Sequence, residues 1–149
     1  MKFFCAIALF ALSLLAVGCG ANQNNGSING NWTASLMNST SNQAPVLAFT
    51  LTLAQSNGTG VSVTNLNFTT SSPCFASGST ATGGFTLSGN TNGVTSGGFQ
   101  MNVVSAGSAS GNLLTLQGTV SGNTISGTWT LSGTTAGCSG SGNFTMNRM

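Results

Sequence analysis

Strict alternation of apolar with polar or small residues is the feature that most constrains this chain. In residues 46–54 (VLAFTLTLA), Leu47, Phe49, Leu51 and Leu53 occupy every second position, with Ala and Thr between them. Side chains of a strand point alternately to its two faces, so a period of two places the apolar residues on one face of a half-buried strand. No comparably long stretch after residue 19 carries helical periodicity. The chain is therefore predicted to be all-β.

The same alternation recurs in short segments separated by clusters of Gly, Ser and Asn. The cluster at residues 56–60 (SNGTG) contains Asn-Gly, which supplies the positive φ angles that tight hairpins need. Similar clusters at residues 90–93, 121–123 and 139–143 are predicted to be turns. Eight strands are predicted in this way. The alternating apolar residues that identify them are Trp32 to Leu36, Leu47 to Leu53, Val61 to Phe68, Phe85 with Leu87, Phe99 to Val103, Leu114 to Val120, Ile125 to Leu131, and Phe144 with Met146.

The third of these strands changes parity part-way along. Val61 and Val63 follow one alternation, whereas the next apolar residues, Leu66 and Phe68, follow the other. One extra residue in a strand turns every later side chain to the opposite face, as a β-bulge does. A bulge is therefore predicted near residues 64–65.

The near absence of charge bears on how these strands assemble. Eight short strands in sequence fit either a closed up-and-down barrel or a two-sheet sandwich. Lys2 and Arg148 are the only charged side chains, and the chain contains no Asp, Glu or His. Exposed sheet edges are usually protected by charged residues, and closure removes the edges altogether. We therefore predict a single antiparallel up-and-down β-barrel of about eight strands, with the sandwich as the alternative.

The N-terminal residues have a different character from the rest. Lys2 gives a positive start, residues 3–17 form an almost unbroken apolar run, and a small residue, Gly18, precedes Cys19. This is the layout of a secretory signal peptide. As a helix the run covers about 22 Å, which is short of the roughly 30 Å hydrocarbon core of a bilayer. An N-terminal signal helix is therefore predicted in preference to a retained transmembrane helix.

The end of this run, residues 15–19 (LAVGC), resembles the lipobox of bacterial lipoproteins. In that family the Cys is lipid-modified and becomes the first residue of the mature chain, and Leu is preferred at the position that Ala16 holds here. The resemblance implies that acylated Cys19 contacts membrane lipid. Gly20 in place of Asp resembles the default signal for the outer membrane, which implies a lipoprotein of the cell envelope facing the periplasm or the cell surface. Ordinary cleavage that leaves Cys19 as a plain thiol is the alternative.

The chain then divides into three parts. Residues 1–18 are predicted to be the signal peptide, and residues 19–29 to be the lipidated Cys followed by a flexible polar tether. Residues 30–149 are predicted to be the β-barrel domain, which is enough chain for one hydrophobic core.

Two cysteines remain once the signal peptide and the lipid anchor are set aside. Cys74 and Cys138 in an exported protein favour one disulfide, with two buried free thiols as the alternative. The bond would close a loop of about 64 residues, for which the chain-entropy model gives roughly 4 kcal/mol of stabilisation. A metal site is not expected, since two thiols without His, Asp or Glu cannot complete a four-ligand shell.

A Gly-x-Trp sequence occurs at residues 30–32 and again at residues 127–129. On the first strand it resembles the opening of calycin-type barrels, the lipocalin and avidin-like families, although the rest of the lipocalin signature is absent. The resemblance implies that Trp32 closes one end of the barrel. It also implies that a cationic residue near the last strand lies across this Trp, and Arg148 stands in a compatible place.

The composition excludes most catalytic mechanisms. General acid–base catalysis needs groups that exchange protons near neutral pH, and the mature chain offers only Cys74 and Cys138. Its many hydroxyl groups have no base to activate them. We therefore expect a protein that is not an enzyme and has no cofactor. Without a basic face it is also not expected to bind nucleic acid.

Binding and structural roles remain. An eight-stranded barrel is about the smallest that can hold one small ligand, and it can equally be filled by its own side chains. The protein is therefore predicted to bind a small neutral or apolar ligand inside the barrel. The alternative is a structural or adhesive surface module with a solid core, for which low net charge favours self-association. The residues expected to line the pocket or form the core are Trp32, Phe49, Leu51, Phe85, Phe99, Met101, Leu116, Trp129 and Phe144.

Overall fold

The computed structural model describes residues 26–39, 45–70, 72–75, 78–106 and 111–149, and within these ranges it contains strands and no helix. The predicted signal helix and Cys19 lie outside the described residues. The eight strands are β1 (Gly30–Asn38), β2 (Leu47–Gln55), β3 (Gly60–Phe68), β4 (Thr80–Thr91), β5 (Val94–Val104), β6 (Leu113–Ser121), β7 (Thr124–Ser132) and β8 (Gly140–Arg148).

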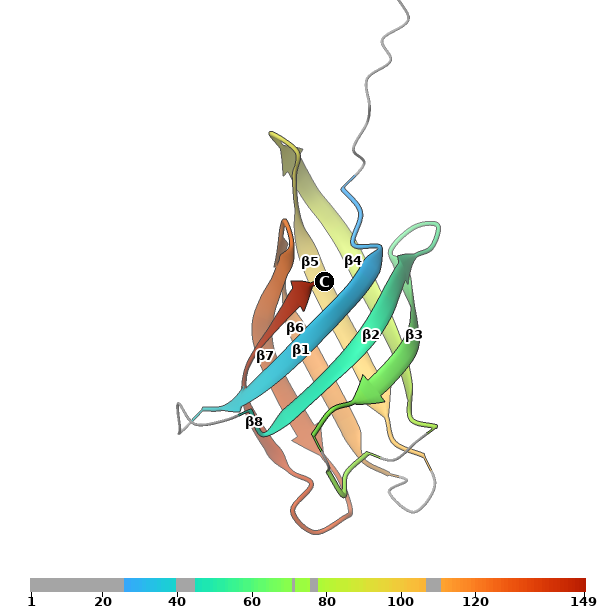
Figure 1. The fold of residues 1–149 in the computed structure, drawn as a ribbon, viewed down its shortest axis with the longest axis vertical. Helices are drawn as coiled ribbons and strands as arrows, with labels where there is room; N and C mark the ends of the chain where they lie inside the picture. The colour runs from blue at the N-terminus through green and yellow to red at the C-terminus, as the bar shows by residue number, and fades with distance from the viewer. Residues whose placement is uncertain (1–25, 40–44, 71, 76–77, 107–110) are drawn as a thin grey trace, which may run out of the picture.

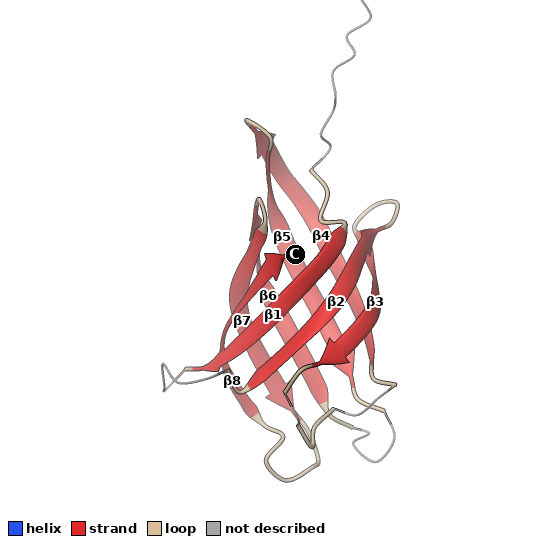
Figure 2. Ribbon diagram, in the orientation of Figure 1, coloured by secondary structure: helices blue, strands red, loops and turns tan. Residues whose placement is uncertain are grey.

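Each strand pairs antiparallel with the next, and β8 pairs with β1 to close the barrel (Figures 1 and 2). The predicted up-and-down barrel of eight strands is thus confirmed, and the closure excludes the sandwich. The ladders differ in length: β4 and β5 pair along almost their whole length, whereas β3 and β4 share only the pairs from Gly60 with Gly84 to Ser62 with Thr82.

The predicted bulge in β3 is confirmed. Thr50 of β2 pairs with Asn67, but Thr52 pairs with Thr64, so β3 holds one residue more than β2 between these two pairs. Asn65 lies in this excess and has a φ of 52°, a left-handed conformation that Asn tolerates better than most residues. The extra residue resets which face of β3 points inward.

The two ends of the barrel are built differently. At one end, here called the terminal end, β1 begins, β8 ends, and the connections are short, at residues 56–59, 92–93 and 122–123. At the opposite end, here called the loop end, the connections are longer, at residues 39–46, 69–79, 105–112 and 133–139. Figure 1 shows the chain entering β1 and leaving β8 at the same end.

The turn predicted at residues 139–143 is wrong, because β8 already begins at Gly140. A Cβ on Gly142 would meet the carbonyl oxygen of Met37, and it would also crowd the indole nitrogen of Trp129. Gly142 is therefore needed for the close approach of β8 to its neighbours and not for a turn. The connection itself occupies residues 133–139.

Inward-facing side chains form one hydrophobic core that runs the length of the barrel. Phe85 and Leu87 both belong to the inward alternation of β4, yet Phe85 is buried and Leu87 is exposed. The β4–β5 hairpin extends beyond the neighbouring strands (Figure 1). Leu87 lies in this hairpin, where it pairs with Gly97 close to the turn at residues 92–93, and it is therefore at the rim of the terminal end. Alternation therefore identifies which face of a strand points inward, but it does not show where along the strand burial ends.

Candidate functional site

The barrel interior is the ligand site predicted from the sequence. The structure brings all nine predicted interior residues into one core cluster, and none of them exposes more than 5% of its surface. A void large enough for a ligand would leave accessible area on the side chains around it. These side chains therefore fill the space that they surround.

Residues 26–29 close the terminal end, and we call them the plug. Ile28 is fully buried in the core, and the indole Nε1 of Trp32 donates a hydrogen bond to its carbonyl oxygen at 2.9 Å. The flexible tether predicted from the sequence is wrong for residues 26–29, because the plug packs on the barrel. Ile28 is the one large apolar residue in residues 21–29, and this was the available signal.

Arg148 holds the plug from the last strand. Its guanidinium carbon lies 4.9 Å from the ring centroid of Trp32, which confirms the contact implied by the calycin resemblance. Nη1 donates to the carbonyl oxygen of Asn29 and Nη2 to that of Ser27, each at 2.8 Å. Arg148 is the one charged side chain among the described residues. The cation is thus fixed at the terminal end.

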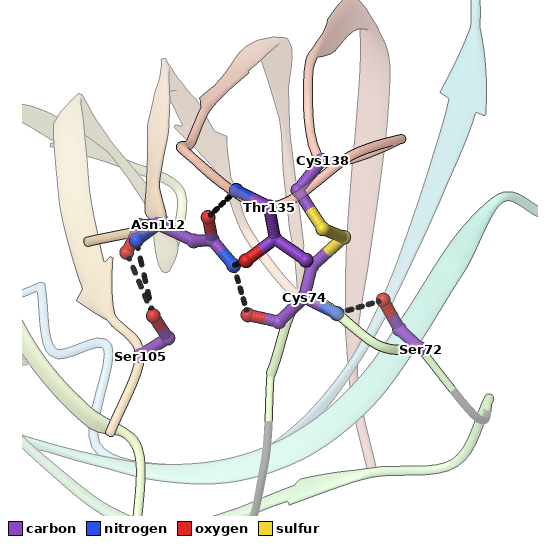
Figure 3. The surroundings of a disulfide bond; sticks show 6 residues. All are labelled: Ser72, Cys74, Ser105, Asn112, Thr135 and Cys138. Atoms are coloured by element: carbon purple, nitrogen blue, oxygen red, sulfur yellow. Dashed lines mark hydrogen bonds between the residues drawn. A yellow bond between two sulfur atoms is a disulfide. The ribbon is translucent and has the colours of Figure 1, made fainter. Parts of the chain in front are cut away.

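The disulfide predicted between Cys74 and Cys138 is confirmed and lies at the loop end (Figure 3). It joins the β3–β4 connection to the β7–β8 connection, and both cysteines are buried. Phe75, beside Cys74, stacks on Phe68 of β3 with ring centroids 4.9 Å apart. Burial of Phe75 was not predicted, because it lies in a connection with no alternation around it.

Asn112 ties the same connections together by hydrogen bonds (Figure 3). Its Nδ2 donates to the carbonyl oxygen of Cys74 at 3.0 Å and to the hydroxyl of Thr135 at 3.2 Å. Its backbone N–H donates to the hydroxyl of Ser105 at 3.1 Å. The side chain is fully buried and satisfied on both its atoms, since its Oδ1 accepts from the N–H of Thr135. The disulfide and Asn112 therefore join three connections of the loop end to one another.

The outer wall of β6, β7 and β8 carries a regular array of uncharged polar side chains, which we call the polar grid. Three outward-facing residues from each strand lie in register across the three strands. Neighbours are about 4.8 Å apart across strands and roughly 6.7 Å apart along a strand. The grid consists of Thr115, Gln117 and Thr119 on β6, Ser126, Thr128 and Thr130 on β7, and Ser141, Asn143 and Thr145 on β8.

A hollow of about 320 Å³ borders the polar grid over β4, β5 and β6. Gly84 and Gly98 lie in it, and a Cβ on Gly98 would meet nothing within 4 Å. The side chains of Thr86, Gln100 and Gln117 surround this space, which therefore offers hydroxyl and amide groups. Neither the grid nor the hollow could be predicted from the sequence, because both depend on the register between strands.

No family model, curated protein or solved structure matches this chain. The closed barrel is nevertheless consistent with a calycin-type architecture. In the part of the chain that the structure describes, no His, Cys, Asp or Glu side chains cluster in a way that could hold a metal ion. Nor does any helix in that part have the length and hydropathy needed to cross a bilayer.

Proposed function

We propose that this protein is an exported lipoprotein, held at a membrane by acylated Cys19, that works as a structural or adhesive module through its outer wall. The observation that carries this proposal is the filled interior, because nine side chains with at most 5% exposure leave no room for a ligand among them. Contact with other molecules is thereby assigned to the outside of the barrel. The lipobox-like residues 15–19 support the anchor.

The polar grid supplies the contact surface in this proposal. Its hydroxyl and amide groups both donate and accept hydrogen bonds, and none of them is charged. Hydroxyl-rich glycans present the same kinds of group and need no charged partner. The bordering hollow adds room for a protruding hydroxyl or sugar ring beside Gln117. A glycan surface in the cell envelope is therefore the partner that this wall fits best.

Chemistry on a substrate is not part of the proposed role. The chain contains no Asp, Glu, His or Tyr, and Cys74 and Cys138 are bonded to each other. Hydroxyl groups such as those of the grid need a neighbouring base to become nucleophiles. The proposed module therefore needs no cofactor and acts by contact alone.

Mass spectrometry of the intact exported protein tests the anchor and the interior together. The expected mass is that of a chain beginning at Cys19, increased by its acyl groups and decreased by the two hydrogens lost in the disulfide. No small molecule should be retained under native conditions. An unmodified N-terminal Cys19 would refute the anchor, and a stoichiometric small molecule would favour the ligand-binding interpretation.

Binding to insoluble envelope polysaccharides tests the polar grid. A double variant, Thr128→Val with Thr145→Val, removes two hydroxyls that lie diagonally across the β7–β8 ladder while keeping the shape of both side chains. Thr82→Val is the matched control, because Thr82 is exposed on β4 outside the grid. We expect the double variant to bind several-fold less than the parent and the control to be unchanged. Equal binding by all three proteins would refute the role of the grid.

A further inference from the structure

The plug determines where the proposed lipid anchor can reach. Gly26 is buried, and a Cβ on it would collide with Leu87 and approach Thr95, so the chain is fixed to the barrel from this residue onward. Cys19 precedes Gly26 by seven residues (26 − 19). Seven residues span at most about 25 Å, because a fully extended chain covers no more than about 3.6 Å per residue. The terminal end is therefore held within that distance of the acyl groups.

The height of the barrel is close to the maximum length of the tether, so the tether length decides which end of the barrel lies near the membrane. Strands of nine residues, such as β1 and β8, rise about 30 Å. With the tilt of about 40° that barrel strands adopt, the wall is roughly 23 Å high. The loop end would reach the bilayer only if the tether were almost fully stretched along the wall. The terminal end reaches it with a relaxed tether.

The surface of the terminal end suits a membrane. Leu87, Val94 and Met149 all lie at this end and are exposed. Arg148 lies at the same end, next to Met149 in the chain, and it is half-buried as a residue, with its Nε buried. Nη1 and Nη2 each use one N–H for a plug carbonyl, which leaves one further N–H on each of these nitrogens for another acceptor. A cation among exposed apolar side chains fits the interfacial region, where anionic phosphates lie next to acyl chains.

The loop end differs from the terminal end in charge, but not in the exposure of apolar side chains. Val46, Val104 and Leu113 are exposed there, so apolar area alone does not distinguish the two ends. Among the described residues, however, the loop end carries no charged side chain. The short tether and the position of Arg148 both select the terminal end.

We propose that the terminal end is a membrane-contact surface, in which Leu87, Val94 and Met149 enter the headgroup region of a phospholipid bilayer and Arg148 faces its phosphates. The loop end, with its disulfide, then points away from the membrane, and the polar grid stands on the side of the barrel. This inference rests on the acylation of Cys19 in the proposed function.

Tryptophan reporters at the two ends of β5 test the orientation. Val94 and Val104 are the same residue type, expose 47% and 50% of their surface, and stand at opposite ends of one strand. The full-length acylated protein, as Val94→Trp or Val104→Trp, is reconstituted into phosphatidylethanolamine–phosphatidylglycerol vesicles whose acyl chains carry bromine. The signal of the parent, which contains Trp32 and Trp129, is subtracted. Met149→Trp repeats the test at the residue that directly follows β8.

We expect bromine to quench the emission of Val94→Trp and Met149→Trp several-fold more strongly than that of Val104→Trp. Equal quenching, or stronger quenching of Val104→Trp, in a protein that floats with the vesicles would overturn the proposed orientation and leave the anchor intact. A protein that lacks the acyl mass and does not float would overturn the anchor and this inference with it. Flotation and mass spectrometry of the same samples distinguish these two failures.

Discussion

Trp32 and Arg148 are direct partners in the β1–β8 ladder that closes the barrel, and the guanidinium carbon lies 4.9 Å from the indole centroid. The same guanidinium donates to the carbonyl oxygens of Ser27 and Asn29. One side chain therefore connects the first strand, the last strand and the plug. Trp32 is itself fixed to the plug, because its indole Nε1 donates a hydrogen bond to the carbonyl oxygen of Ile28.

Replacement of this side chain should loosen the terminal end. We expect Arg148→Met to lower the free energy of unfolding by roughly 2 kcal/mol, because it removes the cation–π contact and both hydrogen bonds to the plug. Arg148→Lys is the control, since it keeps the charge but cannot donate from two nitrogens at once. Its free energy of unfolding should lie between that of the parent and that of Arg148→Met. Urea unfolding measures both. Superimposable curves for Arg148→Met and the parent would contradict the assignment.

The disulfide should contribute much of the stability of the domain. We expect the double variant Cys74→Ser with Cys138→Ser to lose about 4 kcal/mol, because a closed loop of about 64 residues restricts the unfolded chain. Since both cysteines are buried, the native parent should also resist reduction until it unfolds. Chemical denaturation with and without a reducing agent measures both effects. Rapid thiol labelling of the reduced but still folded protein would show that the loop end opens readily.

Asn112 should be far more sensitive than exposed asparagines. Asn112→Ala removes bonds to Cys74 and Thr135 and leaves their groups without this partner at the loop end. We expect a loss of about 3 kcal/mol, as for other buried polar groups whose partners become unsatisfied. Asn102→Ala, on the exposed face of β5, is the matched control and should change stability by less than about 0.5 kcal/mol. Similar losses in the two variants would refute the role of Asn112.

Two glycines on the barrel wall should respond in opposite ways to the same substitution. Gly127 of β7 pairs with Gly118, and a Cβ on Gly127 would collide with the carbonyl oxygen of Gln117. We expect Gly127→Ala to cost about 3 kcal/mol or more, because backbone cannot yield as a flexible side chain does. Gly98→Ala meets open space and should stabilise by about 0.5 kcal/mol through the unfolded state. Thermal unfolding distinguishes them, and equal stabilities would contradict the close approach of β6 and β7.

Stability should be almost independent of pH. A pH dependence of unfolding requires groups that bind protons differently in the folded and unfolded states, and the chain has no Asp, Glu, His or Tyr. Cys74 and Cys138 do not titrate while they are bonded to each other. The free energy of unfolding should therefore change by less than about 0.5 kcal/mol from about pH 4 to 9. A transition near about pH 6 would reveal a proton-linked event in a chain that offers no histidine for it.

Local patterns in the sequence predicted the strands and their faces. The alternation around Leu47 to Leu53 reflects burial of one face, and the parity slip before Leu66 reflects the bulge at Asn65. Both signals are local, because the period of two is a property of a single strand. The turn wrongly predicted at residues 139–143 shows the limit of this reasoning. A glycine cluster has the same composition whether it serves a turn or, as at Gly142, a close contact between strands.

The features that position the candidate site were decided by the tertiary structure. The polar grid exists because the register aligns Gln117, Thr128 and Asn143, which no single strand specifies. Nothing in the local sequence distinguishes Asn112 from the other asparagines, because its hydrogen-bond partners lie in connections that are distant along the chain. Whether the interior is filled depends on how many large side chains share the volume that eight tilted strands enclose. The sequence therefore determined the elements, the neutral composition and the lipobox-like N-terminal pattern, whereas packing and register decided the closed core, the plug and the polar grid.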